Sequence, residues 1–127
     1  MNKHSGSCLC GKITYKTDSE LRPIIACHCT QCRKTSGHFV AATQVPTSKL
    51  YIDGEVTWHQ SSKEARRGFC NTCGGNLFWQ PGDRSYTSIF AGTLDGPTNL
   101  SIESQIHTDS KGDYYDLPPV PIADQQP

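Results

Sequence analysis

The cysteines of this chain gather in three short groups, and their spacing predicts two metal sites. The groups are Cys8 with Cys10, Cys27 with Cys29 and Cys32, and Cys70 with Cys73. Two cysteine pairs separated by a long insertion are typical of a closed, four-thiolate structural zinc site. A group of three supplies only three thiolates, and a zinc ion with three protein ligands keeps one position open for chemistry. The pattern therefore predicts two zinc ions per chain, one structural and one catalytic.

The two pairs, Cys8, Cys10, Cys70 and Cys73, form what we call the four-cysteine group. Glycine follows each pair, as Gly11 and as Gly74 with Gly75. Small residues at these places let backbone amides approach the sulfur atoms and donate hydrogen bonds to them. The alternatives are ordinary buried cysteines or a redox-active C-x-x-C pair. As a zinc site, the group would tie the N-terminal loop to the middle of the chain.

Cys27, Cys29 and Cys32, which we call the triplet, are predicted to hold the catalytic ion. The alternative is a second structural site that a histidine completes, with His28, His38, His59 and His107 as candidates. His28 stands between two ligands, and in an extended loop neighbouring side chains point to opposite sides, so it should point away from the metal. His38 follows Cys32 by six residues and could reach.

Composition limits the classes of function. The 127 residues suit one domain, and twelve basic residues balance twelve acidic ones. The basic pairs Arg33-Lys34 and Arg66-Arg67 are interpreted as solvated surface, so a nucleic-acid partner is not expected. No apolar run has membrane-spanning length and the first residues carry no signal-like segment, so we expect a cytoplasmic protein without a membrane partner. Thiols stay reduced there, and an odd number of cysteines, seven, cannot pair completely.

The chain is predicted to be mainly β. Apolar residues alternate with polar ones, or cluster in β-branched runs between turn residues, in five segments, and Asp53-Gly54 predicts a hairpin between 50–52 and 55–59. The five segments are 12–16, 39–45, 66–69, 76–80 and 85–91. A turn of helix is expected after Cys32. We expect one domain over residues 1–117 and a proline-rich tail over 118–127, extended or disordered.

Residues 6–11, 27–37, 67–74 and 90–95 together resemble the glutathione-dependent formaldehyde-activating enzyme family, which shares a domain with centromere protein V. The resemblance covers nearly the whole chain. It implies a β-tent fold of several small antiparallel sheets stapled by zinc. It also implies a structural zinc on the four-cysteine group and a catalytic zinc on the triplet. The activity it implies is that of a carbon-sulfur lyase, with S-hydroxymethylglutathione formed from, or releasing, formaldehyde and glutathione.

The triplet suits a thiol substrate. Three thiolates on Zn²⁺ give a net charge of −1, so the ion polarises a carbonyl weakly but readily holds a further soft sulfur ligand. Lys34, Ser36 and Gly37 lie just beyond the last ligand and could contact the substrate. The sequence departs from the family near its C-terminal side. The family often has an apolar residue after a histidine and a later tryptophan, whereas here Thr108 follows His107 and only Tyr114 and Tyr115 come after.

Two other classes of protein also use grouped zinc-binding cysteines. A non-catalytic, zinc-stapled binding module is the alternative, because the family shares its domain with a chromosome-associated protein. A methionine-R-sulfoxide reductase would also carry paired zinc cysteines, but it needs a free catalytic cysteine near the C-terminus. No cysteine follows Cys73, so this class is excluded.

Overall fold

The computed structural model describes residues 3–123 and contains ten strands and one α-helix. The strands are β1 His4–Ser7, β2 Thr14–Thr17, β3 Ile24–Cys27, β4 Val40–Pro46, β5 Leu50–Asp53, β6 Thr57–His59, β7 Ala65–Phe69, β8 Asn76–Pro81, β9 Tyr86–Phe90 and β10 Ile102–Ile106. The helix is α1 Thr30–Ser36, and the short 3₁₀ turns are η1 Thr47–Lys49, η2 Ala91–Thr93 and η3 Thr108–Ser110. The prediction of a mainly β fold with small sheets is confirmed.

A three-stranded antiparallel sheet has the order β1-β2-β5. Along β2 the side chains of Tyr15 and Thr17 are buried, whereas Thr14 and Lys16 face solvent, which confirms the alternation seen in the sequence. Tyr15 packs directly on Gly6 of β1, where a Cβ atom would lie 2.2 Å from the tyrosine oxygen. Glycine is therefore required at this position for the two strands to pair.

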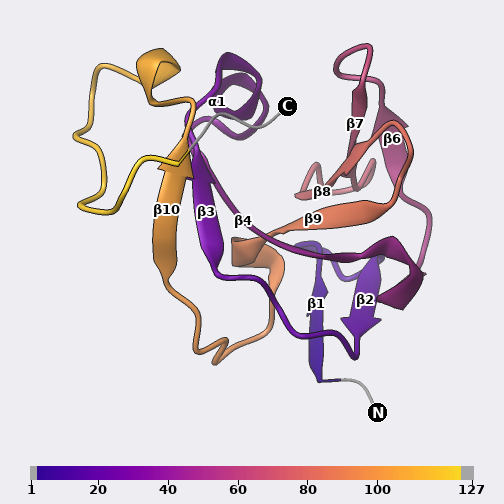
Figure 1. Ribbon diagram of the computed structural model, residues 1–127. Helices are drawn as coiled ribbons and strands as arrows, with labels where there is room; N and C mark the ends of the chain where they lie inside the picture. Colours follow the sequence, from indigo (N-terminus) through magenta and orange to yellow (C-terminus); the bar gives the residue numbers. More distant parts are fainter. Residues whose placement is uncertain (1–2, 124–127) are drawn as a thin grey trace.

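The second sheet has seven strands in the order β10-β3-β4-β9-β8-β7-β6. Its neighbours are antiparallel except β10 and β3, which run parallel. Figure 1 shows β3, β10 and α1 on one side of the molecule and β6, β7 and β8 on the other, with β4 and β9 between them. The sheet therefore carries the triplet and the Cys70–Cys73 turn on well-separated strands.

The predicted hairpin around Asp53-Gly54 is wrong. β5 pairs with β2 in the small sheet, and β6 pairs with β7 in the large one, so the turn joins two sheets instead of two partners. Gly54 has φ +102°, and a Cβ atom there would lie 2.2 Å from the carbonyl oxygen of Lys12. The turn needs glycine because the chain passes against the backbone of another loop as it changes sheet.

The hydrophobic core contains two members of the four-cysteine group. Its fully buried large side chains include Tyr15 and Phe78, whose rings meet edge to face with centroids 5.3 Å apart. Cys8 and Cys70 pack in the same cluster, whose other buried members are Ile13, Val45, Leu77 and Ile89. Metal binding at these cysteines would therefore stabilise the core directly.

Several elements depart from the sequence-based expectation. β1, β3 and β10 were not predicted, and α1 starts at Thr30 and contains Cys32 instead of following it. Of the proposed tail, residues 118–123 lie along β10, where the amide of Ala123 donates to the Gln105 carbonyl and that of Gln105 donates to Pro121. The final residues, 124–127, lie outside the described part of the chain. Within that part, no helix is long and apolar enough to cross a membrane.

Candidate metal centres

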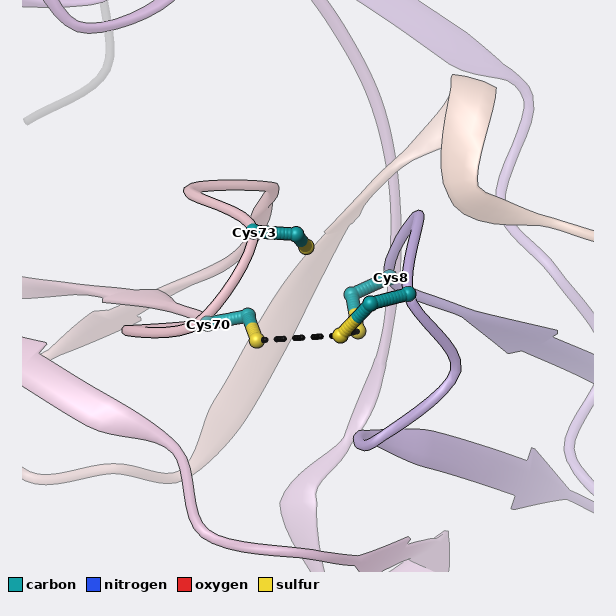
Figure 2. Close-up of side chains that lie close together, drawn as sticks. Cys8, Cys70 and Cys73 are labelled. Atoms are coloured by element: carbon teal, nitrogen blue, oxygen red, sulfur yellow. Dashed lines mark hydrogen bonds between the residues drawn. The ribbon is translucent and has the colours of Figure 1, made fainter.

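The sulfur atoms of the four-cysteine group lie close enough to share one ion. All four are within 4.8 Å of one another, and Cys10 Sγ is 3.7 Å from both Cys8 Sγ and Cys70 Sγ. A tetrahedral zinc with Zn–S bonds of about 2.3 Å separates its sulfurs by about 3.8 Å. In Figure 2 the side chains of Cys70 and Cys73 point from one loop toward Cys8 on the other. The spacing fits a zinc ion.

Each pair of this group sits on a tight turn closed by backbone hydrogen bonds. In the first turn the Cys8 amide donates to the Ile13 carbonyl at 3.0 Å, and the Ile13 amide donates to Cys8 Sγ at 3.4 Å. In the second, the Gly74 amide donates to the Cys70 carbonyl at 2.8 Å. Hydrogen bonds from the amides of Cys10 and Gly75 lower the pKa of the Cys73 thiol to about 6. The backbone thus favours the thiolate form of Cys73 before any metal binds.

The triplet lies where β3 ends and α1 begins. Cys27 is the last residue of β3, Cys29 is the N-cap of α1, and Cys32 is in the first turn of the helix. The three sulfur atoms lie within 4.8 Å of one another, and Cys29 Sγ accepts a hydrogen bond from the Cys32 amide at 3.3 Å. Hydrogen bonds from Cys27 and Cys32 also hold the pKa of Cys29 far below its usual range. The hydrogen bond with Cys29 in turn raises the pKa of Cys27, so without a metal the negative charge is concentrated on Cys29.

Among residues 3–123, no histidine nitrogen or carboxylate oxygen completes the triplet within the same 4.8 Å. His28 is fully buried and points elsewhere, since its Nδ1 lies 2.7 Å from the Tyr115 hydroxyl and its Nε2 2.9 Å from Gln105 Oε1. His38, the other nearby candidate, has Nδ1 at 2.7 Å from the Tyr114 hydroxyl. The orientation expected for His28 is thus observed.

The Gln105 side chain fixes the protonation of His28. Gln105 Nε2 donates to the carbonyls of Pro118 and Val120 at 2.9 and 3.0 Å. Gln105 Oε1 is therefore the atom that faces the imidazole of His28. His28 Nε2 then carries the proton, and Nδ1 accepts from the Tyr115 hydroxyl. Burial lowers the pKa of His28, which favours this neutral form. Residues 105–120 thereby hold the loop between Cys27 and Cys29 from behind.

Arg67 corrects the expectation that the Arg66-Arg67 pair is solvated surface. Its side chain is only 6% exposed, and its Nη2 donates to Cys32 Sγ at 3.6 Å. Arg66 on the same strand points away, with its guanidinium 3.8 Å from the Trp58 ring centroid and hydrogen-bonded to Gln80. The strand alternation of β7 was the signal in the sequence, because it sends neighbouring side chains to opposite faces.

The residues suggested as substrate contacts have different surroundings. Lys34 is exposed, whereas the Ser36 hydroxyl donates to the Cys32 carbonyl at 2.7 Å and Gly37 ends α1 with φ +85°. A shallow hollow of about 340 Å³ lies beside the helix. It is lined by Arg33, Lys111, Gly112, Asp113 and Tyr114. The segment after β10, which departs from the family pattern, thus forms one wall of this region.

Comparison with known proteins agrees with this geometry. Residues 3–110 match the model of the family described as glutathione-dependent formaldehyde-activating enzyme. An uncharacterized lyase of Schizosaccharomyces pombe is 32% identical over 120 residues, which are 92% of this chain and 87% of the relative. A crystal structure of a Rhodobacter sphaeroides protein has a TM-score of 0.62 at 24% identity, covers 73% of this chain and 89% of its own, and shows the fold alone. The chain therefore belongs to the glutathione-dependent formaldehyde-activating enzyme family.

Proposed function

We propose that this protein is a zinc-dependent carbon-sulfur lyase that adds a small thiol such as glutathione to formaldehyde. In the reverse direction it would split the adduct into formaldehyde and the thiol. The family and the lyase relative support a lyase role. We further propose that Cys8, Cys10, Cys70 and Cys73 hold a structural zinc and that Cys27, Cys29 and Cys32 hold a catalytic one.

One observation carries the proposal. The four-cysteine group offers a complete tetrahedral set, whereas the triplet offers three sulfurs and, within the described chain, no fourth protein ligand. Zinc bound at three thiolates keeps a position for an external ligand and supplies a charge that favours a thiolate over its thiol. A small thiol is the soft ligand that such a position suits best.

The reaction needs few protein groups. A thiolate sulfur forms a bond to the formaldehyde carbon, the carbon–oxygen π bond opens, and the proton that left the thiol ends on the new hydroxyl. The three cysteines would hold the zinc ion to which the thiol binds. The start of α1 keeps Cys29 and Cys32 in place. His28 is not a candidate general base, because both of its ring nitrogens are hydrogen-bonded and its side chain is buried.

The test measures the sulfur ligands of zinc and the rate together. With both sites loaded, X-ray absorption at the zinc edge should show the mean number of sulfur ligands per zinc rising from about 3.5 toward about 4 when glutathione is added, because only the triplet gains a ligand. The protein should also speed equilibration of formaldehyde, glutathione and their adduct above the spontaneous rate, and Cys29→Ser should not. Unchanged sulfur coordination at saturating glutathione would overturn the thiol mechanism. Thiol binding without acceleration would favour a different carbon–sulfur substrate. The absence of both thiol binding and acceleration would favour a zinc-stapled binding module.

A further inference from the structure

Arg67 is a buried cation without a carboxylate partner. Within residues 3–123, no Asp or Glu oxygen lies within 4.0 Å of its guanidinium. Its guanidinium donates to Cys32 Sγ at 3.6 Å and to Thr35 Oγ1 at 3.5 Å, and within the same residues its buried Nε has no hydrogen-bond acceptor. A buried charge is costly unless an opposite charge compensates it. Within the described part of the chain, Cys32 of the triplet is the only group in contact with Arg67 that can carry an opposite charge.

The two cysteine groups differ in which groups compensate the negative charge of their sulfur atoms. In the four-cysteine group, backbone amides such as that of Ile13 donate to sulfur. At the triplet a full positive charge, from a strand distant in sequence, adds to the one amide that donates to Cys29. Three thiolates and a divalent ion sum to −1, which one guanidinium neutralises. A neutral fourth ligand leaves that balance unchanged, whereas a thiolate adds a negative charge close to Arg67.

We infer that Arg67 is the counter-ion of the triplet, a positioning residue whose charge strengthens metal binding there and favours an anionic fourth ligand over a neutral one. The inference rests on the proposed function for the identity of that ligand, a thiolate. The charge of Arg67 acts through Cys32, so the residue itself need not touch the substrate. Its unpartnered Nε is a further donor available on the same side chain.

Three variants separate charge from packing. Arg67→Met keeps the bulk and removes the charge, Arg67→Lys keeps the charge, and Arg66→Met is the matched control on the same strand. Each protein is loaded with Co²⁺ or Zn²⁺ without any thiol, and metal affinity is measured by chelator competition. A Cys27→Ser reference assigns the metal that remains on the four-cysteine group. We expect Arg67→Met to lower the metal affinity of the triplet by about 10- to 100-fold, as loss of a hydrogen bond to a metal-binding side chain typically does.

The same cobalt proteins are then titrated with glutathione and, separately, with imidazole as a neutral ligand. Arg67→Met should lower glutathione affinity by about tenfold or more and change imidazole affinity little, because hydrogen bonds to charged groups are the stronger ones. Arg67→Lys should lie closer to the parent protein than Arg67→Met, and Arg66→Met should match the parent.

Several outcomes would overturn the inference. Equal losses in Arg67→Met and Arg67→Lys would assign Arg67 a packing role, and parent-like metal affinity in both would remove any role at the triplet. Equal changes in glutathione and imidazole affinity would remove the preference for an anionic ligand. If the triplet of the parent protein holds no metal, the inference and the proposed function both fail. If Arg67→Met weakens the metal but glutathione never binds the parent, only the proposed function and the ligand preference fail.

Discussion

The four-cysteine group and the triplet use the same ligand atom but are built in opposite ways. The first joins two separate turns, at Cys8–Cys10 and Cys70–Cys73, and both turns are closed by their own backbone hydrogen bonds. The second is one continuous segment at the end of β3 and the start of α1, and it is held by side chains from other elements, Arg67 and Gln105 among them. A site that only ties the chain together can be supported locally by the backbone. In the proposed function the triplet keeps a coordination position open, and side chains from distant strands would hold its shape.

The largest expected effect comes from breaking the four-cysteine group. Cys70→Ser should lower the free energy of unfolding by several kcal/mol, because Cys70 is in the core cluster and zinc binding there is linked to folding. Cys29→Ser should keep the fold, since serine is itself a preferred N-cap residue, yet abolish activity. Chemical denaturation of both variants provides the measurement. Similar losses in the two would show that the triplet is equally structural.

Chelation should separate the two groups in time. Fully loaded protein should contain two zinc ions, and a chelator should remove the triplet ion first, because its open position admits a competing ligand. The released zinc can be followed with a colorimetric indicator while far-ultraviolet circular dichroism reports the fold. Loss of the first ion should leave the β signal intact, and loss of the second should not. Elemental analysis that gives one zinc would contradict the two-site reading.

A smaller effect is expected at the support behind the triplet. Gln105→Leu leaves His28 Nε2 and the carbonyls of Pro118 and Val120 without their partner, which should cost about 1–3 kcal/mol of stability. Metal affinity at the triplet should fall with it. Glu103→Gln, exposed on the same strand, is the control and should change stability by less than about 0.5 kcal/mol. An unchanged triplet in Gln105→Leu would show that this support does not reach the metal.

The smallest effect distinguishes the two tyrosines after β10. Tyr115→Phe removes the hydroxyl that bonds the buried His28 and should cost about 1 kcal/mol. Tyr114→Phe removes one that bonds the exposed His38 and should cost less than about 0.5 kcal/mol. Thermal unfolding of the pair, at matched metal content, gives the comparison. The reverse order would mean that the exposed contact, and not the buried one, supports the loop.

The candidate metal-binding cysteines could be recognised in the sequence because each of their three short groups is local, even though two of these groups meet only in the fold. Cys27, Cys29 and Cys32 lie within six residues, and a chain segment this short brings its sulfurs together at one strand-to-helix junction. Strand β2 could be found in the same way, since its pattern of burial repeats every two residues. β3 and β10 were missed because β3 is a four-residue apolar run and β10 is mostly polar, so neither shows a clear alternation.

The sequence by itself thus determined which cysteines are grouped as candidate metal ligands, the β-rich class and the family. Only the tertiary structure decided which strands are neighbours: β5 leaves its apparent hairpin partner for β2, and β10 runs parallel beside β3. It also decided that Arg67 is buried at Cys32 and that Gln105 holds His28. The physical reason is that spacing along the chain constrains only nearby atoms. Burial and counter-charges depend on residues that pairing between distant strands brings together.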